Sequence, residues 1–520
     1  MKKFKLTFIL LLVTIFTLVL VGCNSANKRT GEFMSIDEIV ENAKKLTNDP
    51  ASEQTYEKTG TPNFNVPNGG YDGSKVEIKF YHTMGQNLKA VLDKYIGKFN
   101  ELYPNITVVN EQVGGYDDVR NQVSTELTIG GQPNIAYCYP DHVALYNLAG
   151  AVVNLDNLID STVEITRADG TKEILGLTAE QKADFIEGYY NEGRQFGDGL
   201  MYTMPFSKST EVLYYNETFF TENNISIPDH WFSSGENDTT SMEYVCEKIK
   251  SIDPNSIPLG YDSEANWFIT MCEQCGSPYT SATGNHYLFN NPTNMAVIAR
   301  FREWYQKGWL TTQALYGSYT SGLFVAETGT RSYMSIGSSA GATHQRPSKV
   351  TIEDDEGNEM NVYPFNVGIT SIPQMNPNRP KVISQGPSVC IFNNAGGSSI
   401  TDQQIVASWL LVKYLTTSVE FQAEFSMTSG YVPVLKSVAS NPVYSAFTAK
   451  ANGGDNIAAL SAKVCLAQEN AYYTSPAFNG SSTARDQVGY LVQKIFSTKT
   501  SNVYGLVAEA FEDAIDECEY

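Results

Sequence analysis

One short motif has the residue types for acyl-transfer chemistry. Gly337, Ser339 and Gly341 fit the G-x-S-x-G pattern of a nucleophile elbow, which presents a serine hydroxyl on a sharp turn. In that fold the acid and then the histidine follow later in the chain, but His344 lies only three residues past the motif and is the last histidine. A serine hydrolase is therefore disfavoured. Ser338 and Ser339 in this glycine-rich turn instead suit hydrogen bonding to a ligand oxygen, with a plain turn as the alternative.

Other patterns of enzymes and metal sites are weak in this chain. It has no Walker-type phosphate loop and no G-x-G-x-x-G, and its five histidines do not pair at the spacing of metal ligands. Cys272 and Cys275 form a C-x-x-C pair, but no second pair completes four ligands, so packing or a local disulfide is favoured over zinc. The acidic run 353–359 is most simply a solvated loop. We therefore predict no metal and no cofactor.

The first residues have the features of an export signal. Three lysines precede an apolar run from Leu6 to Val21, and small residues follow just before Cys23. The tetrad 20–23, Leu-Val-Gly-Cys, resembles a lipobox, which implies cleavage before Cys23 and lipid on its sulfur. An uncleaved membrane anchor is the alternative, although the run is short for a spanning helix. Either way we expect a body tethered to the outer face of the cell membrane.

The charge excludes some partners. Loss of residues 1–22 removes three lysines and no acid, which leaves 33 basic and 57 acidic residues. A strongly negative body is repelled by nucleic acid and by anionic membrane surfaces. We predict no nucleic-acid partner and a monomer held out from the bilayer.

Strand and helix patterns alternate at the start of the body. Residues 75–83 alternate as a strand, 88–104 place apolar residues on one helical face, and 106–113 return as a strand. A helix, a strand and a helix follow up to residue 150, which indicates a parallel α/β sheet. Ligands of such sheets lie on the loops after the strands. Those loops include 114–117 and 139–142.

The length predicts two domains, since 520 residues are too many for one hydrophobic core, and 204–216 predicts a passage between them. In 204–216 Pro205 breaks a strand before a second extended run. In 401–434 Thr401 with Gln404 predicts a capping box, a second helix stops at Gly430, and Tyr431 follows on a turn where its ring can face a cleft. Two further expectations are that Trp267 lines the cleft, with a place in the core as the alternative, and that 24–73 is mostly a tether.

Several stretches together resemble one family over nearly the whole exported chain. They include FYHTMG (80–85), QPNIAYCYPDHV (132–143), MPFSKSTEVLYYN (204–216), SYMSIGSSAGAT (332–343), ISQGPSVCIF (383–392) and TSGYVPV (428–434). Their order is similar to that of family 1 extracellular solute-binding proteins of ABC importers, closest to the glycerol-3-phosphate and sugar-binding branch. The resemblance implies a two-lobe α/β fold of type II, each lobe a mixed sheet flanked by helices, with the ligand cleft between the lobes.

The resemblance also implies ligand contacts. Positions matching those of the branch are Tyr116, Ser209, Ser339, Gly386 and Tyr431, with Ser338 beside Ser339 in the same turn. Where the branch has a glutamate for glycerol hydroxyls, this chain offers Asp141. Where it has an arginine for phosphate, the nearest candidate is Arg485, displaced by a couple of residues, and Lys208 is a second candidate for the anion.

The expected organisation places the segments in two lobes. We predict a signal peptide at 1–22, a lipidated cysteine and tether at 23–73, a first lobe from 74–206 with 371–418, and a second lobe from 207–370 with 419–520. The expected function is capture of a sugar or glycerophosphate for an ABC permease, without covalent chemistry. An exported glycoside hydrolase stays an alternative, because two catalytic carboxylates are paired in space and not by sequence spacing. An adhesin or structural lipoprotein is the third.

Overall fold

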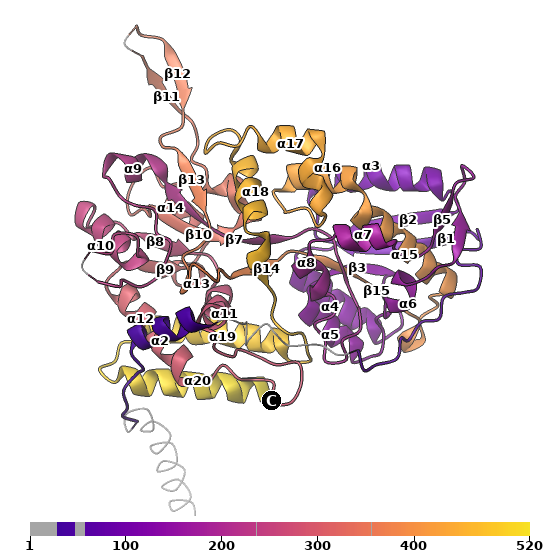
Figure 1. Cartoon of the computed structure of the whole chain (residues 1–520), viewed down its shortest axis with the longest axis horizontal. Coiled ribbons are helices and arrows are strands. Elements are labelled where there is room, and N and C mark those ends of the chain that lie inside the picture. Colours follow the sequence, from indigo (N-terminus) through magenta and orange to yellow (C-terminus); the bar gives the residue numbers. More distant parts are fainter. Residues whose placement is uncertain (1–28, 47–57, 236, 355, 520) are drawn as a thin grey trace, which may run out of the picture.

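The computed structural model describes residues 29–46, 58–235, 237–354 and 356–519. Two β-sheets with helices packed against them form two lobes that lie side by side (Figure 1). The fold class predicted from the sequence, α/β with two lobes, is confirmed. The predicted signal peptide and Cys23 lie outside the described residues, and no helix within them is long and apolar enough to cross a membrane.

The first lobe is built on a five-stranded sheet of order β2-β1-β3-β15-β6. Its strands are β1 Val76–His82, β2 Ile106–Gln112, β3 Ile135–Cys138, β6 Met204–Pro205 and β15 Ser388–Ile391. The helices between them are α3 Gln86–Leu102, α4 Tyr116–Leu127, α5 Pro140–Asn147 and, later, α8 Glu187–Glu192. β1, β2 and β3 are parallel, as the alternation of strands and helices predicted, whereas β15 runs antiparallel to both β3 and β6.

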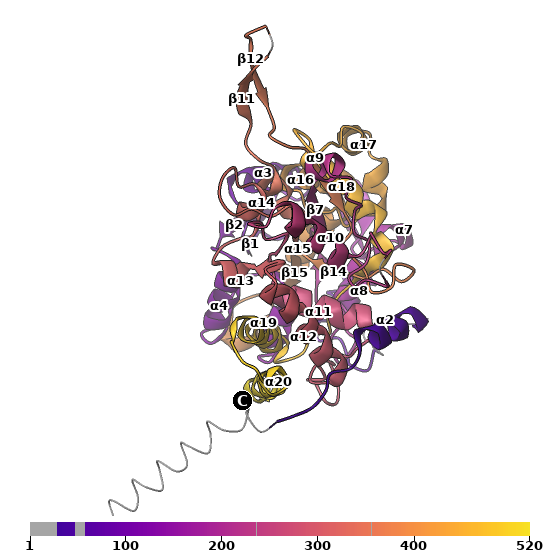
Figure 2. The same cartoon turned by 90° about the vertical axis from the view of Figure 1, so that its left-hand side faces the viewer.

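The second lobe holds a mixed sheet of order β16-β14-β7-β10-β8-β9, and β13 also pairs with β7. These strands are β7 Ser209–Asn216, β8 Leu259–Tyr261, β9 Leu310–Thr312, β10 Met334–Ser338, β13 Val367–Thr370, β14 Val382–Gln385 and β16 Tyr472–Tyr473. Four helices pack together beside it: α11 Glu264–Cys275, α12 Pro292–Gln306, α19 Ser481–Ser497 and α20 Val503–Glu519 (Figures 1 and 2).

The chain passes between the two sheets at two adjacent points. β6 lies in the first sheet and β7 in the second, so residues 206–208 make the first passage, as predicted. β14 belongs to the second sheet and β15 to the first, so the return lies at Gly386, later than the boundary expected at residue 371. Gly386 has φ +92°, and a Cβ there would lie 2.7 Å from the Ser207 carbonyl oxygen. A side chain at this position would therefore force the two passages apart.

The helix pair predicted after Thr401 is confirmed. The Thr401 hydroxyl and the Gln404 side chain form the capping box of α15 Asp402–Thr417. Ser418 caps α16 Val419–Ser429, and Gly430 ends it in the left-handed conformation with φ +76°. α16 packs on α3 of the first lobe, so the chain enters the second lobe after α16 and not at residue 419.

The segment expected to be a tether packs on the body in its described parts. α2 Ile36–Lys45 buries Ile39 and Ala43 against α11 and α12 of the second lobe (Figure 2). Farther along, the Asn63 amide donates to the Val152 carbonyl oxygen at 2.8 Å in the first lobe, and Phe64 is buried. Residues 29–46 and 58–73 are therefore folded parts of the two lobes.

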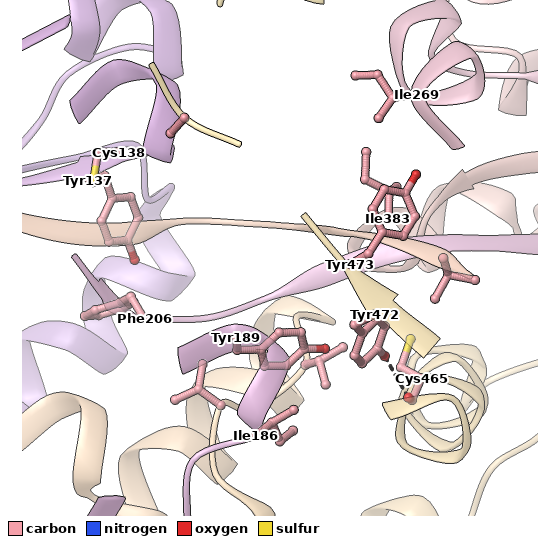
Figure 3. Close-up of a cluster of buried hydrophobic side chains, with 14 of the residues drawn as sticks. Tyr137, Cys138, Ile186, Tyr189, Phe206, Ile269, Ile383, Cys465, Tyr472 and Tyr473 are labelled. Carbon is pink, nitrogen blue, oxygen red and sulfur yellow. Dashed lines mark hydrogen bonds between the residues drawn. The ribbon is translucent and has the colours of Figure 1, made fainter. Parts of the chain in front are cut away.

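Aromatic rings fill the core where the strands pass between the lobes. Figure 3 shows Tyr137 and Phe206 on one side of this region and Tyr472 and Ile383 on the other. Tyr137 and Phe206 meet edge to face with their centroids 5.1 Å apart. The Tyr472 hydroxyl donates to the Cys465 carbonyl oxygen at 2.7 Å. Such large apolar surfaces hold the passages in place by burial as well as by ring geometry.

Two hairpins lie outside the two main sheets. β4 Glu164–Thr166 pairs with β5 Lys172–Ile174, and β11 Val350–Glu353 pairs with β12 Glu359–Val362. The second hairpin carries the acidic run and projects far from the second lobe (Figures 1 and 2).

Candidate functional site

A cavity of about 270 Å³ lies between the lobes, near the lower end of the usual size for ligand sites. The first lobe lines it with Asp117, Arg120, Tyr139, Pro140, Asp141, His142 and Glu192. The second lobe lines it with Ile269, Tyr279, Ile383, Ser384, Gln385, residues 474–477, Ser481, Ser482, Arg485 and Asp486. Two of the predicted ligand contacts, Asp141 and Arg485, are thus in its wall.

The segment that follows β3 supplies residues 139–142 of the first-lobe wall, and α4 and α8 supply the rest. Pro140 is the first residue of α5, a position where proline is favoured because the missing N–H is not needed. Tyr139, Asp141 and His142 are thereby placed at the carboxyl end of a parallel strand, where the sequence predicted the ligand loops.

Behind Tyr139 lies a group of tyrosines that includes two predicted contacts. The Tyr116 and Tyr139 rings are 4.6 Å apart between centroids, and Tyr116 is nearly parallel to Tyr137 at 6.5 Å. The Tyr116 and Tyr431 hydroxyl oxygens are 3.4 Å apart. Tyr116 and Tyr431, which are 315 residues apart in sequence, are therefore brought together beside the cavity.

The second-lobe wall is mainly polar. Ser384 and Gln385 end β14, and Arg485 projects from the first turns of α19. The Arg485 guanidinium donates from Nη2 to the side-chain oxygen of Asn266 on α11. This wall can present hydroxyl, amide and guanidinium groups to a bound molecule.

Acidic groups outnumber basic ones around the cavity. The two cationic side chains are those of Arg120 and Arg485. The carboxylates are those of Asp117, Asp141, Glu192 and Asp486. Arg120 already contacts Asp117 Oδ1 at 3.3 Å and the Ser482 hydroxyl of the opposite lobe at 3.3 Å. Burial raises the pKa of Asp486 above its ordinary value.

Three buried polar atoms in the wall have no hydrogen-bond partner among the described residues. They are His142 Nδ1 from the first lobe and the hydroxyls of Tyr279 and Ser384 from the second. Burial lowers the pKa of His142, so its imidazole is neutral at pH 7 and can either donate or accept. Buried polar groups almost always have partners, so a hydroxylated ligand in this cavity would suit all three.

The predicted serine and glycine contacts lie deeper than the cavity wall. The Ser339 hydroxyl accepts from the Thr210 backbone N–H at 3.1 Å and is fully buried. The Ser338 hydroxyl accepts from the Ala340 N–H at 3.3 Å, which makes it a local turn contact. Ser209 pairs with Gln385 across β7 and β14 and is buried too. Together with Gly386 these residues support the wall strand β14.

Trp267 does not line the cleft. Its side chain is 3% exposed and meets Phe301 edge to face at 4.7 Å and Phe496 at 6.0 Å, within the core of the second lobe. Its position on α11 turns it toward α12 and α19. The alternative reading of this tryptophan, as a core residue, is the one that the structure supports.

Lys208 is not free to bind an anion. Its Nζ is buried and pairs with Glu192, while donating to the Gly386 carbonyl at 3.2 Å and the Ser388 hydroxyl at 3.0 Å. This network joins α8 of the first lobe to both passages between the lobes. Lys208 is therefore a structural cation where the chain passes between the lobes.

The nucleophile-elbow motif forms a strand end followed by a 3₁₀ turn, with its serine hydroxyl engaged as above and His344 exposed. Cys272 and Cys275 are buried free thiols on α11. Within the described ranges no cluster of histidine, cysteine and acidic side chains is placed to hold a metal ion.

Residues 94–452 match the family model described as bacterial extracellular solute-binding protein. The chain belongs to this family. Among curated relatives it is similar to the sn-glycerol-3-phosphate-binding periplasmic protein UgpB of Salmonella paratyphi A, 24% identical over 143 residues. That match covers 28% of this chain and only 30% of the relative.

Solved structures of solute-binding proteins share the fold over most of the chain. The cyclic α-maltosyl-1,6-maltose binding protein of Arthrobacter globiformis superposes with a TM-score of 0.63 at 16% identity, covering 86% of this chain and 99% of that one. UgpB of Mycobacterium tuberculosis in complex with glycerophosphocholine gives 0.59 at 16% identity, covering 85% and 98%. Identities this low establish the fold and leave the ligand open.

Sequence reasoning missed several residues of this cavity. Tyr139 and His142 belong to a loop that the strand pattern had placed on the ligand rim, so this signal was available. Tyr279, Ser384 and Arg120 carried no such signal. Tyr279 lies in a loop after α11 and Arg120 within a helix, and only the packing of the two lobes brings them to one cavity.

Proposed function

We propose that this protein is the substrate-binding component of an ABC importer and that its solute is a neutral, polyhydroxylated molecule, most simply a carbohydrate. The observation that carries the proposal is the convergence of three unpartnered polar atoms, from both lobes, on one cavity. Each sugar hydroxyl can both donate and accept a hydrogen bond, so a sugar can pair with the imidazole nitrogen and with the two hydroxyls. The Tyr139 ring supplies a surface for the apolar face of a sugar.

The charges around the cavity favour a neutral ligand over a phosphate. A buried anion needs cationic groups or hydrogen-bond donors close to it. Here Arg120 is paired with Asp117 and Lys208 with Glu192, whereas Arg485 donates to the neutral amide of Asn266. Carboxylates such as Asp141 repel a phosphate but accept hydrogen bonds from sugar hydroxyls.

A glycerophosphate is the second candidate. Two arginines line the cavity, and several curated relatives and one solved structure are named for glycerol-3-phosphate or glycerophosphocholine. In this case Arg485 would bind the phosphate. The rest of the molecule would be held, directly or through support of β14, by the other predicted contacts: Tyr116, Tyr431, Asp141, Ser209, Ser338, Ser339 and Gly386.

The proposed mechanism is capture by closure. The solute would enter while the lobes are apart, the passages at 206–208 and Gly386 would act as hinges, and the contact between Arg120 and Ser482 would form as the lobes meet. The closed form would then be presented to the permease by a monomer anchored through lipid on Cys23. No cofactor and no covalent step are needed.

The test is thermal unfolding of the purified protein with maltose, other mono- and disaccharides, glycerol-3-phosphate and glycerophosphocholine. A ligand at 100 times its dissociation constant stabilises the folded state by about 2.7 kcal/mol. We expect a shift with one or more sugars, and each sugar should be recovered unchanged. Release of a cleaved product would instead support a glycoside hydrolase, and no shift with any compound would contradict the proposal.

A further inference from the structure

A series of hydrogen-bonded side chains connects β7 of the second sheet to the cavity. Glu211 lies on β7, the strand that follows the first passage, and is 1% exposed. The Tyr261 hydroxyl donates to its Oε2 at 2.5 Å, and the Asn266 amide nitrogen donates to its Oε1 at 2.9 Å. Asn266 in turn accepts from Arg485, whose side chain lines the cavity.

The direction of these hydrogen bonds fixes the Asn266 amide. The Asn266 NH₂ group faces Oε1 of Glu211, which accepts from it. The amide oxygen then faces α19, where a guanidinium can only donate. The backbone of Asn266 is held as well, because its N–H donates to the Ser263 hydroxyl that caps α11. The amide therefore has one orientation, and that orientation suits Arg485.

We propose that Glu211 and Asn266 are positioning residues that hold the Arg485 guanidinium in place at the cavity, so that solute affinity depends on them although neither lines the cavity. The inference rests on the proposed solute-binding function. Arginine has several rotatable bonds, and an unheld guanidinium would lose freedom on binding solute, which weakens affinity. The hydrogen bond to Asn266 would restrict the guanidinium in the free protein, so that less conformational freedom is lost when the solute binds.

The experiment is a double-mutant cycle with Asn266→Ala, Arg485→Ala and the double variant. Affinity for maltose is the first readout. We expect each single substitution to weaken maltose binding by about tenfold, and the double variant to bind no more weakly than Arg485→Ala alone, because Asn266 acts only through Arg485. Independent losses that multiply in the double variant would overturn the inference.

The matched control is Asn294→Ala, which removes an equally buried asparagine amide of the same lobe that donates to the Phe289 carbonyl oxygen at 2.9 Å. It should destabilise the fold and leave maltose affinity unchanged. A loss of affinity equal to that of Asn266→Ala would point to general loosening of the lobe and contradict the positioning role. Glu211→Gln, which keeps an acceptor oxygen, should weaken binding less than Asn266→Ala.

The second readout is free of ligand, so it separates this inference from the proposed function. The native protein, Asn266→Ala, Arg485→Ala and the double variant are unfolded in urea without solute. A hydrogen bond between Asn266 and Arg485 predicts that the shifts in unfolding midpoint are not additive. Additive shifts would overturn the contact even if maltose binds the native protein. Non-additive shifts in a protein that binds no compound of the panel would leave the contact standing and defeat the proposed function.

Discussion

The two walls of the cavity differ in the side chains that form them and in how the chain brings those side chains together. The first-lobe wall has an aromatic surface, with Tyr139 backed by Tyr116, and four of its seven residues, 139–142, come from one short segment after β3. The second-lobe wall is polar, is gathered from widely separated parts of the sequence, and is backed by the buried carboxyl of Glu211. A wall built on a single strand-to-helix connection can be recognised in the sequence. A wall assembled by packing cannot.

The comparison also separates two kinds of contribution to binding. Rings supply area and shape for the apolar faces of a solute, whereas the opposite wall supplies directed hydrogen bonds. In the proposed mechanism, closure would bring both to the solute at once, and the Lys208 network joins α8 of the first lobe to both passages. Three kinds of substitution test this difference between the walls. The first removes Lys208 between the lobes, the second removes the buried carboxyl behind the second-lobe wall, and the third removes single tyrosine contacts.

Removing the buried cation of the hinge should have the largest effect. Lys208→Met leaves the Glu192 carboxylate buried without its partner, and such a loss costs about 3–5 kcal/mol of unfolding free energy. Urea unfolding measures it. Lys94→Met, which breaks the exposed pair with Glu424, is the control and should cost less than about 1 kcal/mol. Equal losses in the two variants would contradict a structural role for Lys208.

Stability should depend on pH through Glu211. Burial raises the pKa of this carboxyl to about 7, so the native state holds the proton more tightly than the unfolded chain does. Its contribution to stability is present below the unfolded pKa near 4.5 and is lost as pH rises through about 7, a change of roughly 3 kcal/mol. Urea unfolding from pH 4.5 to 8 should show this loss in the native protein and a flatter profile in Glu211→Gln. The exposed Glu77→Gln should keep the native profile, and a Glu211→Gln profile that matches it would refute the assignment.

The aromatic wall should matter for sugars. Tyr139→Ala removes the ring that lines the cavity, and we expect maltose affinity to fall by about 10- to 30-fold, which corresponds to about 1.4–2 kcal/mol. Calorimetric titration measures the change. Tyr490→Ala, at a position 60% exposed on α19, should leave the affinity as it is. If Tyr139→Ala binds maltose as tightly as the native protein, the ring is not part of the site.

The contact behind that wall should have the smallest effect. Tyr116→Phe removes only a hydroxyl that lies 3.4 Å from the Tyr431 hydroxyl, so affinity should change by less than about fivefold. Tyr431→Ala removes a whole ring and should weaken binding more than Tyr116→Phe. The reverse order, measured by the same titration, would show that the hydroxyl contact dominates.

The sequence allowed the local parts of this structure to be predicted. Thr401 with Gln404, Gly430 and the alternation from β1 to α5 each follow from neighbouring residues, and all are present. Trp267 was misplaced because a tryptophan in a helix has the same pattern whether it faces a core or a cleft. The docking of α2 and the pairing of Glu211, Asn266 and Arg485 depend on contacts between distant segments, which periodicity does not reveal.

Calorimetric titration of the purified protein with maltose and with glycerol-3-phosphate, each in competition with the other, would show whether the cavity binds a neutral polyhydroxylated solute. We expect saturable maltose binding that glycerol-3-phosphate does not displace. Saturable binding of glycerol-3-phosphate without binding of maltose would refute the proposal, because a phosphate would then bind in a cavity whose four carboxylates outnumber its two arginines.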